Sequence, residues 1–219
     1  QLTDTVDFRK RRIKKWLTLL GFFFLSIGII GPKIGTSLTE VKREGINLML
    51  MLDTSLSMNT EDVKPTRLER AKYEASQLVN KLRGDRVGLI AFAGVSYLHS
   101  PLTLDYSAAK MFLDVMDTDL IPSQGTAIGD AINTALASFD SEESKYRAIV
   151  IFSDGEDHLG KAIDAAEEAE ANGVPVFTVG IGTNAGGPIP VTENGETVFK
   201  RDRSGKVVTS RLDSGILQE

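Results

Sequence analysis

The chain has 219 residues and no cysteine, and its formal net charge is −5. This length is sufficient for one ordinary globular domain with an additional segment, and the absence of cysteine excludes a disulfide scaffold, a zinc–cysteine site and a thiol nucleophile. The charge is unevenly distributed: residues 1–45 contain nine Lys and Arg against four Asp and Glu, whereas residues 46–219 contain sixteen against twenty-six. The acidic part would repel phosphate polyanions, which argues against nucleic acid as its partner.

The basic surplus lies in front of an uncharged apolar run. Six of residues 9–15 are Lys or Arg, and the run that follows extends from Trp16 to Pro32. About seventeen residues of helix span roughly 25 Å, which is near the short limit for crossing a bilayer. With Trp16 as an interfacial aromatic residue, we predict a transmembrane helix over residues 16–32. The positive-inside rule then places residues 1–15 in the cytoplasm and residues 46–219 outside.

Two other interpretations of this run are a buried core helix and the apolar region of a cleaved signal peptide. A core helix is expected to have a polar face, and this run has none. A signal peptide is expected to end in small residues, whereas Gly28–Pro32 offers no A-x-A-like cleavage site. We therefore expect a retained membrane helix, followed by a linker over residues 33–45.

From residue 46 onward the pattern alternates between apolar strands and amphipathic helices. Predicted strands cover residues 46–52, 86–93, 147–153 and 174–180, with a short antiparallel edge strand over residues 95–100. Predicted helices cover residues 66–83, 106–115, 126–139 and 159–172. Thr66 and Glu69 form a T-x-x-E capping box at the start of the first of these helices. This alternation predicts an α/β fold, with a doubly wound, mostly parallel sheet and helices on both faces.

The sequence changes character after the last of these strands. Asn194-Gly195 and Ser204-Gly205 are turn signals between β-rich runs. We therefore predict a β-hairpin excursion over residues 188–211, within a domain that covers residues 46–219.

Polar side chains gather where predicted strands end and where a predicted helix begins. The first strand runs into Asp53, Ser55 and Ser57, the third parallel strand ends before Asp154, and Thr126 opens a helix. In an open parallel sheet, ligands bind beyond the carboxyl ends of the strands. The five side chains offer only oxygen atoms, which suit a hard cation: Mg²⁺, or alternatively Mn²⁺ or Ca²⁺. Only two are carboxylates, so a bound ion would keep positive charge and attract an external carboxylate.

Each piece of this set also has an ordinary structural interpretation as a helix N-cap or a turn. Together, however, Asp53-x-Ser55-x-Ser57, Thr126 and Asp154 resemble the metal-ion-dependent adhesion site (MIDAS) of von Willebrand factor type A domains. The stretches GDRVGLIAFAG, GTAIGDAI and SDGEDHLG are similar to the Bat (Bacteroides aerotolerance) proteins. The stretch SDGEDH and residues 116–119 favour the BatB type within that family.

This resemblance implies that the three hydroxyls contact the metal directly and that the two carboxylates act close to it, partly through water. A partner Asp or Glu would complete the coordination. We expect a partner-binding rim around the metal, formed by Leu56, Gln124, Glu156, Asp157 and His158. Leu56 and Gln124 replace smaller residues that are common in the family at those positions. The resemblance also implies a closing helix beyond Glu219.

Members of the family are anchored in the membrane, which implies a bacterial inner membrane location with the domain on the periplasmic side. The resemblance further implies partners among other Bat proteins, including a tetratricopeptide-type member, and a MoxR-like AAA+ ATPase. The setting would be an envelope-stress or aerotolerance complex. We accordingly predict a domain that is not an enzyme and that binds protein partners through a MIDAS-type metal.

Two alternatives remain open. The same oxygen cluster could serve an Mg²⁺-dependent enzyme that acts on a phosphoester or nucleotide, and Gly155–Lys161 comes close to a phosphate-binding loop. However, Ala162 stands where that loop needs Ser or Thr for Mg²⁺, and Glu156 and Asp157 would repel phosphate. The second alternative is a domain whose metal only holds loops together.

Overall fold

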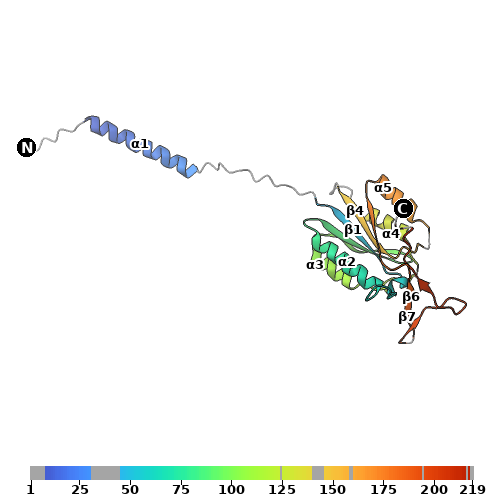
Figure 1. Cartoon of the computed structure of the whole chain (residues 1–219). Coiled ribbons are helices and arrows are strands. Elements are labelled where there is room, and N and C mark those ends of the chain that lie inside the picture. Colours follow the sequence, from blue (N-terminus) through green and yellow to red (C-terminus); the bar gives the residue numbers. More distant parts are fainter. Residues whose placement is uncertain are drawn as a thin grey trace, which may run out of the picture. The chain divides into compact units, whose positions relative to one another are not determined.

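The computed structural model describes residues 8–30, 45–123, 125–139, 146–157, 160–193, 195–215 and 217. Residues 1–7 of the predicted basic segment lie outside the described residues, and so does the predicted linker apart from Gly45. The chain divides into two compact units, residues 1–42 and residues 43–219, which are considered separately below. The described part of the first unit is a single helix, and the second unit contains the sheet (Figure 1).

Helix α1 (Phe8–Ile30) begins with the basic residues and continues through the apolar run. Its large apolar side chains are exposed, from Ile13 near its start to Ile29 near its end. Within the part of the chain that the structure describes, no helix is long and apolar enough to cross a membrane. The span predicted over residues 16–32 is therefore not confirmed: six basic residues occupy the first turns of the helix, and positions 31–32 lie outside the described residues.

The second unit is built on a five-stranded sheet with the order β3-β2-β1-β4-β5. Its strands are β1 (Asn47–Asp53), β2 (Arg86–Phe92), β3 (Ser96–Thr103), β4 (Arg147–Ser153) and β5 (Val176–Gly180). Neighbouring strands pair in parallel, except that β3 runs antiparallel to β2. Every residue of β1 is buried, as expected for an apolar strand at the centre of a parallel sheet. The predicted α/β fold with a mostly parallel sheet is confirmed.

Helices cover both faces of this sheet (Figure 1). On one face lie α2 (Arg67–Lys81) and α3 (Tyr106–Asp114), and on the other lie α4 (Ile128–Ser138) and α5 (Ala162–Ala171). Alternate residues of β1 supply the two cores: Leu50 belongs to the core beneath α2, whereas Met49 and Met51 belong to the core beneath α4. Each face of the sheet therefore has its own hydrophobic layer.

Two helices begin later than predicted. Helix α4 begins at Ile128 rather than at Thr126, because the Ala127 N–H donates to the Ala93 carbonyl at 2.7 Å and ties this residue to the end of β2. Helix α5 begins at Ala162. The start predicted for that helix, Leu159, lies outside the described residues.

After β5 the chain forms small antiparallel pairs of strands. Strand β6 (Gly187–Pro188) pairs with β9 (Thr209–Ser210), and β7 (Pro190–Glu193) pairs with β8 (Glu196–Phe199). These pairs correspond to the predicted hairpin excursion. The Asp213 N–H then donates to the Asp154 carbonyl at 2.8 Å. This return brings the end of the excursion beside the carboxyl end of β4.

Candidate metal centre

The two carboxylates of the predicted ligand set lie at the carboxyl end of the parallel sheet. Asp53 is the last residue of β1, and Asp154 directly follows β4, which pairs with β1. Both residues are completely buried. Two buried anions are costly in free energy unless hydrogen-bond donors or a cation compensate them. The hydrogen bonds and ion pairs of each carboxylate therefore show how much of its negative charge is compensated within the protein.

Asp53 is oriented by donors on both of its oxygens. The Ser55 N–H donates to Oδ1 at 2.9 Å, and the Ser153 hydroxyl donates to Oδ2 at 2.7 Å. Burial and the charge of Asp154 nevertheless raise the pKa of Asp53 from 3.8 to about 7, against the lowering effect of these hydrogen bonds. Among the ion pairs of the described residues, none reaches Asp53. A bound cation would supply the missing positive charge.

Two hydroxyls of the predicted set lie together directly after Asp53. The chain turns there into the short 3₁₀ helix η1 (Leu56–Asn59), with Ser55 at its N-cap. The hydroxyl oxygens of Ser55 and Ser57 are 2.9 Å apart, and the two residues are only 4% and 5% exposed. The Ser55 side chain makes no capping hydrogen bond to η1, so helix capping does not explain this buried pair.

Thr126 lies at the same edge of the sheet, beside the end of β2. Gly94, which follows β2, donates its N–H to the Ser123 carbonyl at 2.9 Å, and this contact draws the loop toward the sheet. Thr126 is 1% exposed, and the N-cap of α4 is Ala127, not Thr126. Its buried hydroxyl is therefore not a helix cap either. It lies at the edge where a cation would bind.

Asp154 has a cationic partner, Arg67, that was not predicted from the sequence. Arg67 Nη1 donates to Asp154 Oδ2 at 2.7 Å, and the Ser210 hydroxyl lies 3.4 Å from the same oxygen. Oδ1 accepts a long hydrogen bond, 3.4 Å, from the Glu156 N–H. Arg67 is 0% exposed although it is the first residue of α2. A signal was present in the sequence: Arg67 stands four residues before Ala71 on the apolar face of its helix.

A further carboxylate, Asp62, holds the other side of the Arg67 guanidinium. Nε and Nη2 donate to its two oxygens at 2.8 and 2.9 Å. Burial raises the pKa of Asp62, but the hydrogen bonds from Arg67 and Thr183 and the charge of Arg67 outweigh it and lower this pKa to about 2. Burial by itself would lower the pKa of Arg67. The contacts of Arg67 with Asp62 and Asp154 outweigh this effect, so its pKa is raised. Arg67 and Asp62 thus stay charged and balance each other.

The predicted partner-binding rim is described in part. Gln124 and His158 lie outside the described residues, and Leu56 is half-buried rather than fully exposed. Glu156 accepts a hydrogen bond from the Ser210 hydroxyl at 2.7 Å, and Asp157 accepts one from the Ala162 N–H at 3.3 Å. These two carboxylates therefore help to fix the loop after β4.

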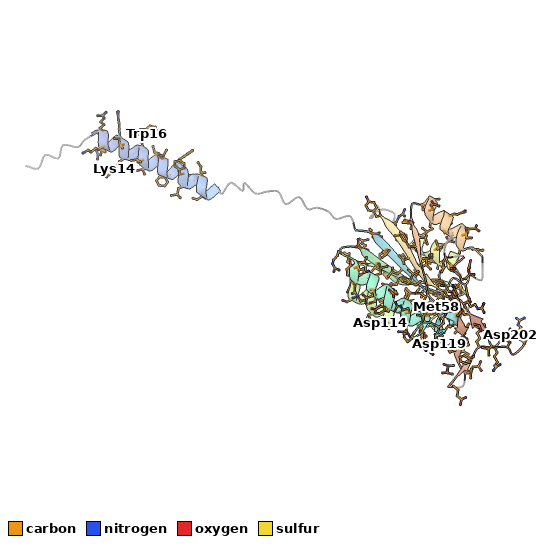
Figure 2. All side chains as sticks on the ribbon, in the orientation of Figure 1. Lys14, Trp16, Met58, Asp114, Asp119 and Asp202 are labelled. Atoms are coloured by element: carbon orange, nitrogen blue, oxygen red, sulfur yellow. The ribbon has the colours of Figure 1, made fainter. Side chains whose placement is uncertain are left out.

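A groove opens beside Leu56. It has a volume of 740 Å³ and lies between η1, the turn at residues 117–119 and the β7–β8 hairpin. Asp119, labelled in Figure 2, lies at the end of the domain from which the hairpins extend. One lysine, Lys200, lines the groove. Four carboxylates line it as well: Glu61, Asp117, Asp119 and Glu193. A partner segment that enters the groove would meet a negatively charged wall.

The donor chemistry determines which cation fits the site. Among the residues that the structure describes, no group of three or more His, Cys, Asp or Glu side chains is arranged to hold a metal ion. The candidate site instead combines two carboxylates with three hydroxyls, so all its donors are oxygen. Such donors fit Mg²⁺ and other hard cations better than metals that prefer imidazole or thiolate.

Comparison with known proteins shows the same architecture. The family model of the von Willebrand factor type A domain matches residues 48–156, a range that contains all five candidate ligands. The crystal structure of BatB from Bacteroides thetaiotaomicron is 46% identical, has a TM-score of 0.76, and matches over 80% of this chain and 84% of that one. An aerotolerance-related membrane protein from Bacteroides fragilis is 45% identical, has a TM-score of 0.75, and matches over 80% and 85%.

The chain is also similar to a more distant protein of known structure and to a longer curated relative. PTMP1 from the mussel byssus, solved with a zinc-occupied MIDAS motif, is 20% identical over 64% of this chain and 38% of that one, with a TM-score of 0.54, which shows the fold alone. A UPF0353 protein from Nocardia farcinica is 33% identical over 188 residues, which are 78% of this chain and 54% of that protein. The chain thus spans between 54% and 62% of the length of the curated relatives that it matches.

Proposed function

Because the chain belongs to the von Willebrand factor type A domain family, we propose that it binds protein partners through a divalent cation at the carboxyl end of its sheet. The observation that carries this proposal is one buried group of oxygen donors: Asp53, Ser55, Ser57, Thr126 and Asp154. Its hydroxyls cap no helix, and no ion pair of the described residues reaches its first carboxylate. A cation explains why these groups are buried together.

Each group of residues has a role in this proposal. The three hydroxyls contact the cation directly, and the two carboxylates balance its charge, in part through water. When bound, the cation supplies an open coordination position for an Asp or Glu of the partner. Mg²⁺ is the cation that such donors favour, with Mn²⁺ and Ca²⁺ as alternatives. The zinc-occupied motif of PTMP1 supports divalent binding by a protein of this fold.

The proposed activity is binding without chemical turnover. A hydrolase of the alternative class would need a nucleophile beside a general base. Of the two histidines, His158 lies outside the described residues, and His99 packs its ring against Phe112 with 5.6 Å between the ring centroids. His99 belongs to β3, the strand at the edge of the sheet, and not to the candidate metal centre. His99 therefore does not supply a general base to this centre.

The partners and the setting are proposed from the family. Similarity to BatB and to an aerotolerance-related membrane protein supports partners among the Bat proteins, with a MoxR-like AAA+ ATPase, in an envelope-stress or aerotolerance complex. The exposed apolar side chains of α1, such as Trp16 at 73% and Phe22 at 67%, support attachment to the bacterial inner membrane. The basic residues that precede them support a periplasmic position for the domain.

A pull-down from envelope extracts, with the 219-residue chain as bait in Mg²⁺ or in EDTA, tests the proposal. We expect partner recovery in Mg²⁺ to fall at least about tenfold in EDTA and in the double variant Ser55→Ala/Ser57→Ala, because the cation loses its ligands. Ser107→Ala, on an exposed position of α3, is the matched control and should recover partners normally.

Three outcomes would contradict this mechanism. Recovery that does not change in EDTA would remove the cation from partner binding. A loss of thermal stability in EDTA without any loss of partners would favour a metal that only holds loops together. Mg²⁺-dependent turnover of a phosphate ester that the double variant lacks would favour the enzyme.

A further inference from the structure

We propose that Arg67 sets the cation preference of the candidate metal site, because its hydrogen bond to one oxygen of Asp154 disfavours binding of a cation through both oxygens of this carboxylate. The inference rests on the proposed function, since it concerns the cation that the site binds. Arg67 is a positioning residue in this proposal: it contacts Asp154 and acts on the metal only through that carboxylate.

Every N–H of the Arg67 guanidinium has an acceptor. Nε and Nη2 donate to the two oxygens of Asp62 at 2.8 and 2.9 Å, and Nη2 also donates to the Ser210 carbonyl at 3.2 Å. Nη1 donates to Asp154 Oδ2 and to the Ser210 hydroxyl, both at 2.7 Å. A guanidinium has five N–H groups in a rigid planar fork, and these contacts use all of them. The group cannot turn away from Asp154 without breaking hydrogen bonds elsewhere.

The surroundings of Arg67 fix it further. Asp62 is held in place by Thr183, whose N–H and hydroxyl donate to Oδ2 at 2.8 and 3.0 Å. Gly182 has φ = +139°, and a Cβ at this residue would lie 3.0 Å from Arg67 Nε, so the backbone passes directly against the guanidinium. The charge of Asp62 offsets that of Arg67, which leaves the charge of Asp154 free to attract a cation.

The carboxylates of the site consequently have few free oxygens. Asp53 accepts hydrogen bonds on both oxygens, whereas Asp154 accepts a short one on Oδ2 and a long one, 3.4 Å, on Oδ1. Ca²⁺ takes about six to eight oxygens and often binds a carboxylate through both of them, whereas Mg²⁺ requires about six in near-ideal octahedral geometry. The Arg67 hydrogen bond to Oδ2 disfavours binding of a cation through both oxygens of Asp154, and this favours Mg²⁺ over Ca²⁺.

Titration calorimetry of the 219-residue chain with MgCl₂ and with CaCl₂ measures this preference as the ratio of the two affinities. In Arg67→Lys, a single ammonium group cannot serve Asp62 and Asp154 in the same geometry. We expect Mg²⁺ affinity to fall about tenfold and the ratio of Ca²⁺ to Mg²⁺ affinity to rise at least about fivefold. Arg70→Lys is the matched control: Arg70 is 47% exposed on the same helix, pairs with Glu74, and should leave the ratio unchanged.

Two further variants decide the question if circular dichroism shows that Arg67→Lys does not fold. Asp62→Asn and Ser210→Ala keep Arg67 but remove contacts that aim it at Asp154, so we expect the ratio to rise about twofold to threefold in each. Folded variants that all keep the wild-type ratio would overturn the role of Arg67 and leave the proposed function intact. A wild-type chain that binds neither cation would overturn the proposed function and this inference together.

Discussion

Asp53 and Asp154 are buried at the ends of neighbouring strands, yet they are compensated differently. Asp154 forms an ion pair with Arg67, a cation that Asp62 also shares, whereas Asp53 relies on the Ser55 N–H and the Ser153 hydroxyl. Because burial and the charge of Asp154 raise the pKa of Asp53 to about 7, this carboxyl binds a proton near neutral pH when no cation is present. In the proposed function, a proton and a metal ion would therefore compete for the same buried charge.

This competition predicts that Mg²⁺ stabilises the domain more at high pH than at low pH. Between the unfolded pKa of 3.8 and the native pKa of about 7, metal-free Asp53 binds more protons in the native state than in the unfolded state. The free energy of unfolding of the metal-free chain therefore falls as pH rises through this range, and Mg²⁺ removes the loss. Thermal unfolding should show a larger increase of Tm by Mg²⁺ at about pH 8 than at about pH 5.

The variant Asp53→Asn separates this effect from other titrations. An amide does not titrate, so the metal-free Tm of the variant should decline less than that of the wild type between about pH 4 and pH 7. An increase of Tm by Mg²⁺ that is equal at all pH values in the wild type would contradict the assigned role of Asp53.

Sequence spacing could predict the candidate ligands Asp53, Ser55 and Ser57, but not Arg67, which contacts Asp154. Asp53, Ser55 and Ser57 alternate within five positions, so a single strand end brings them together. Arg67 reaches partners that are 87 and 143 residues away in the sequence, Asp154 and Ser210. Contacts of that separation depend on the packing of the whole domain. Periodicity along α2 therefore indicates only that a charged residue, Arg67, lies on the apolar face of the helix. It does not identify the residues that Arg67 contacts.

At the scale of elements, the start of α2 connects secondary structure to the site. Arg67 is the first residue of the helix and Thr66 is its N-cap, with Oγ1 accepting from the Glu69 N–H at 3.2 Å. The N-cap thus fixes the turn from which the Arg67 side chain reaches Asp154. Helix capping and metal-site geometry depend on the same local backbone.

We expect Thr66→Ala to lower the free energy of unfolding by about 1 kcal/mol, the usual effect of losing a side-chain N-cap. Denaturant unfolding of the chain in EDTA measures this change without a contribution from bound cation. Thr66→Ser keeps the hydroxyl and should remain within about 0.5 kcal/mol of the wild type. Equal losses in both variants would show that the Thr66 methyl group, and not the cap, stabilises α2.

The existence and type of the main elements could be predicted from periodicity, whereas some boundaries could not. Strand β3 was predicted over residues 95–100 and extends to Thr103, because it pairs with β2 as far as Val87 despite Pro101. A proline is tolerated on an edge strand, where one side needs no hydrogen bonds. Helix α4 loses its first two predicted residues, because the Ala127 N–H donates to the Ala93 carbonyl. Both differences arise from contacts between elements, which a local pattern does not contain.

At the scale of the whole chain, positive charge and apolar surface are concentrated in the first unit, and negative charge in the second. Residues 1–45 carry an excess of five positive charges, and residues 46–219 an excess of ten negative charges. Large apolar residues from Trp16 onward are exposed along α1, whereas the second unit buries apolar residues in two cores and exposes others at separate positions such as Phe177. An exposed surface of this kind indicates a contact with lipid or another apolar partner.

We therefore expect the 219-residue chain to float with vesicles of anionic lipid and to stay bound in about 1 M NaCl, because salt screens charges but not apolar contacts. The double variant Phe22→Glu/Leu25→Glu adds two charges to the apolar part of α1 and should remain unbound. Phe177→Glu, at a residue 56% exposed on β5, adds a charge to the second unit and should float like the wild type.

Release of the wild type by salt alone would attribute the contact to the basic residues at the start of α1. Failure of the wild type to float at low salt would contradict the proposed membrane attachment, because neither the basic nor the apolar part of the helix would then bind lipid.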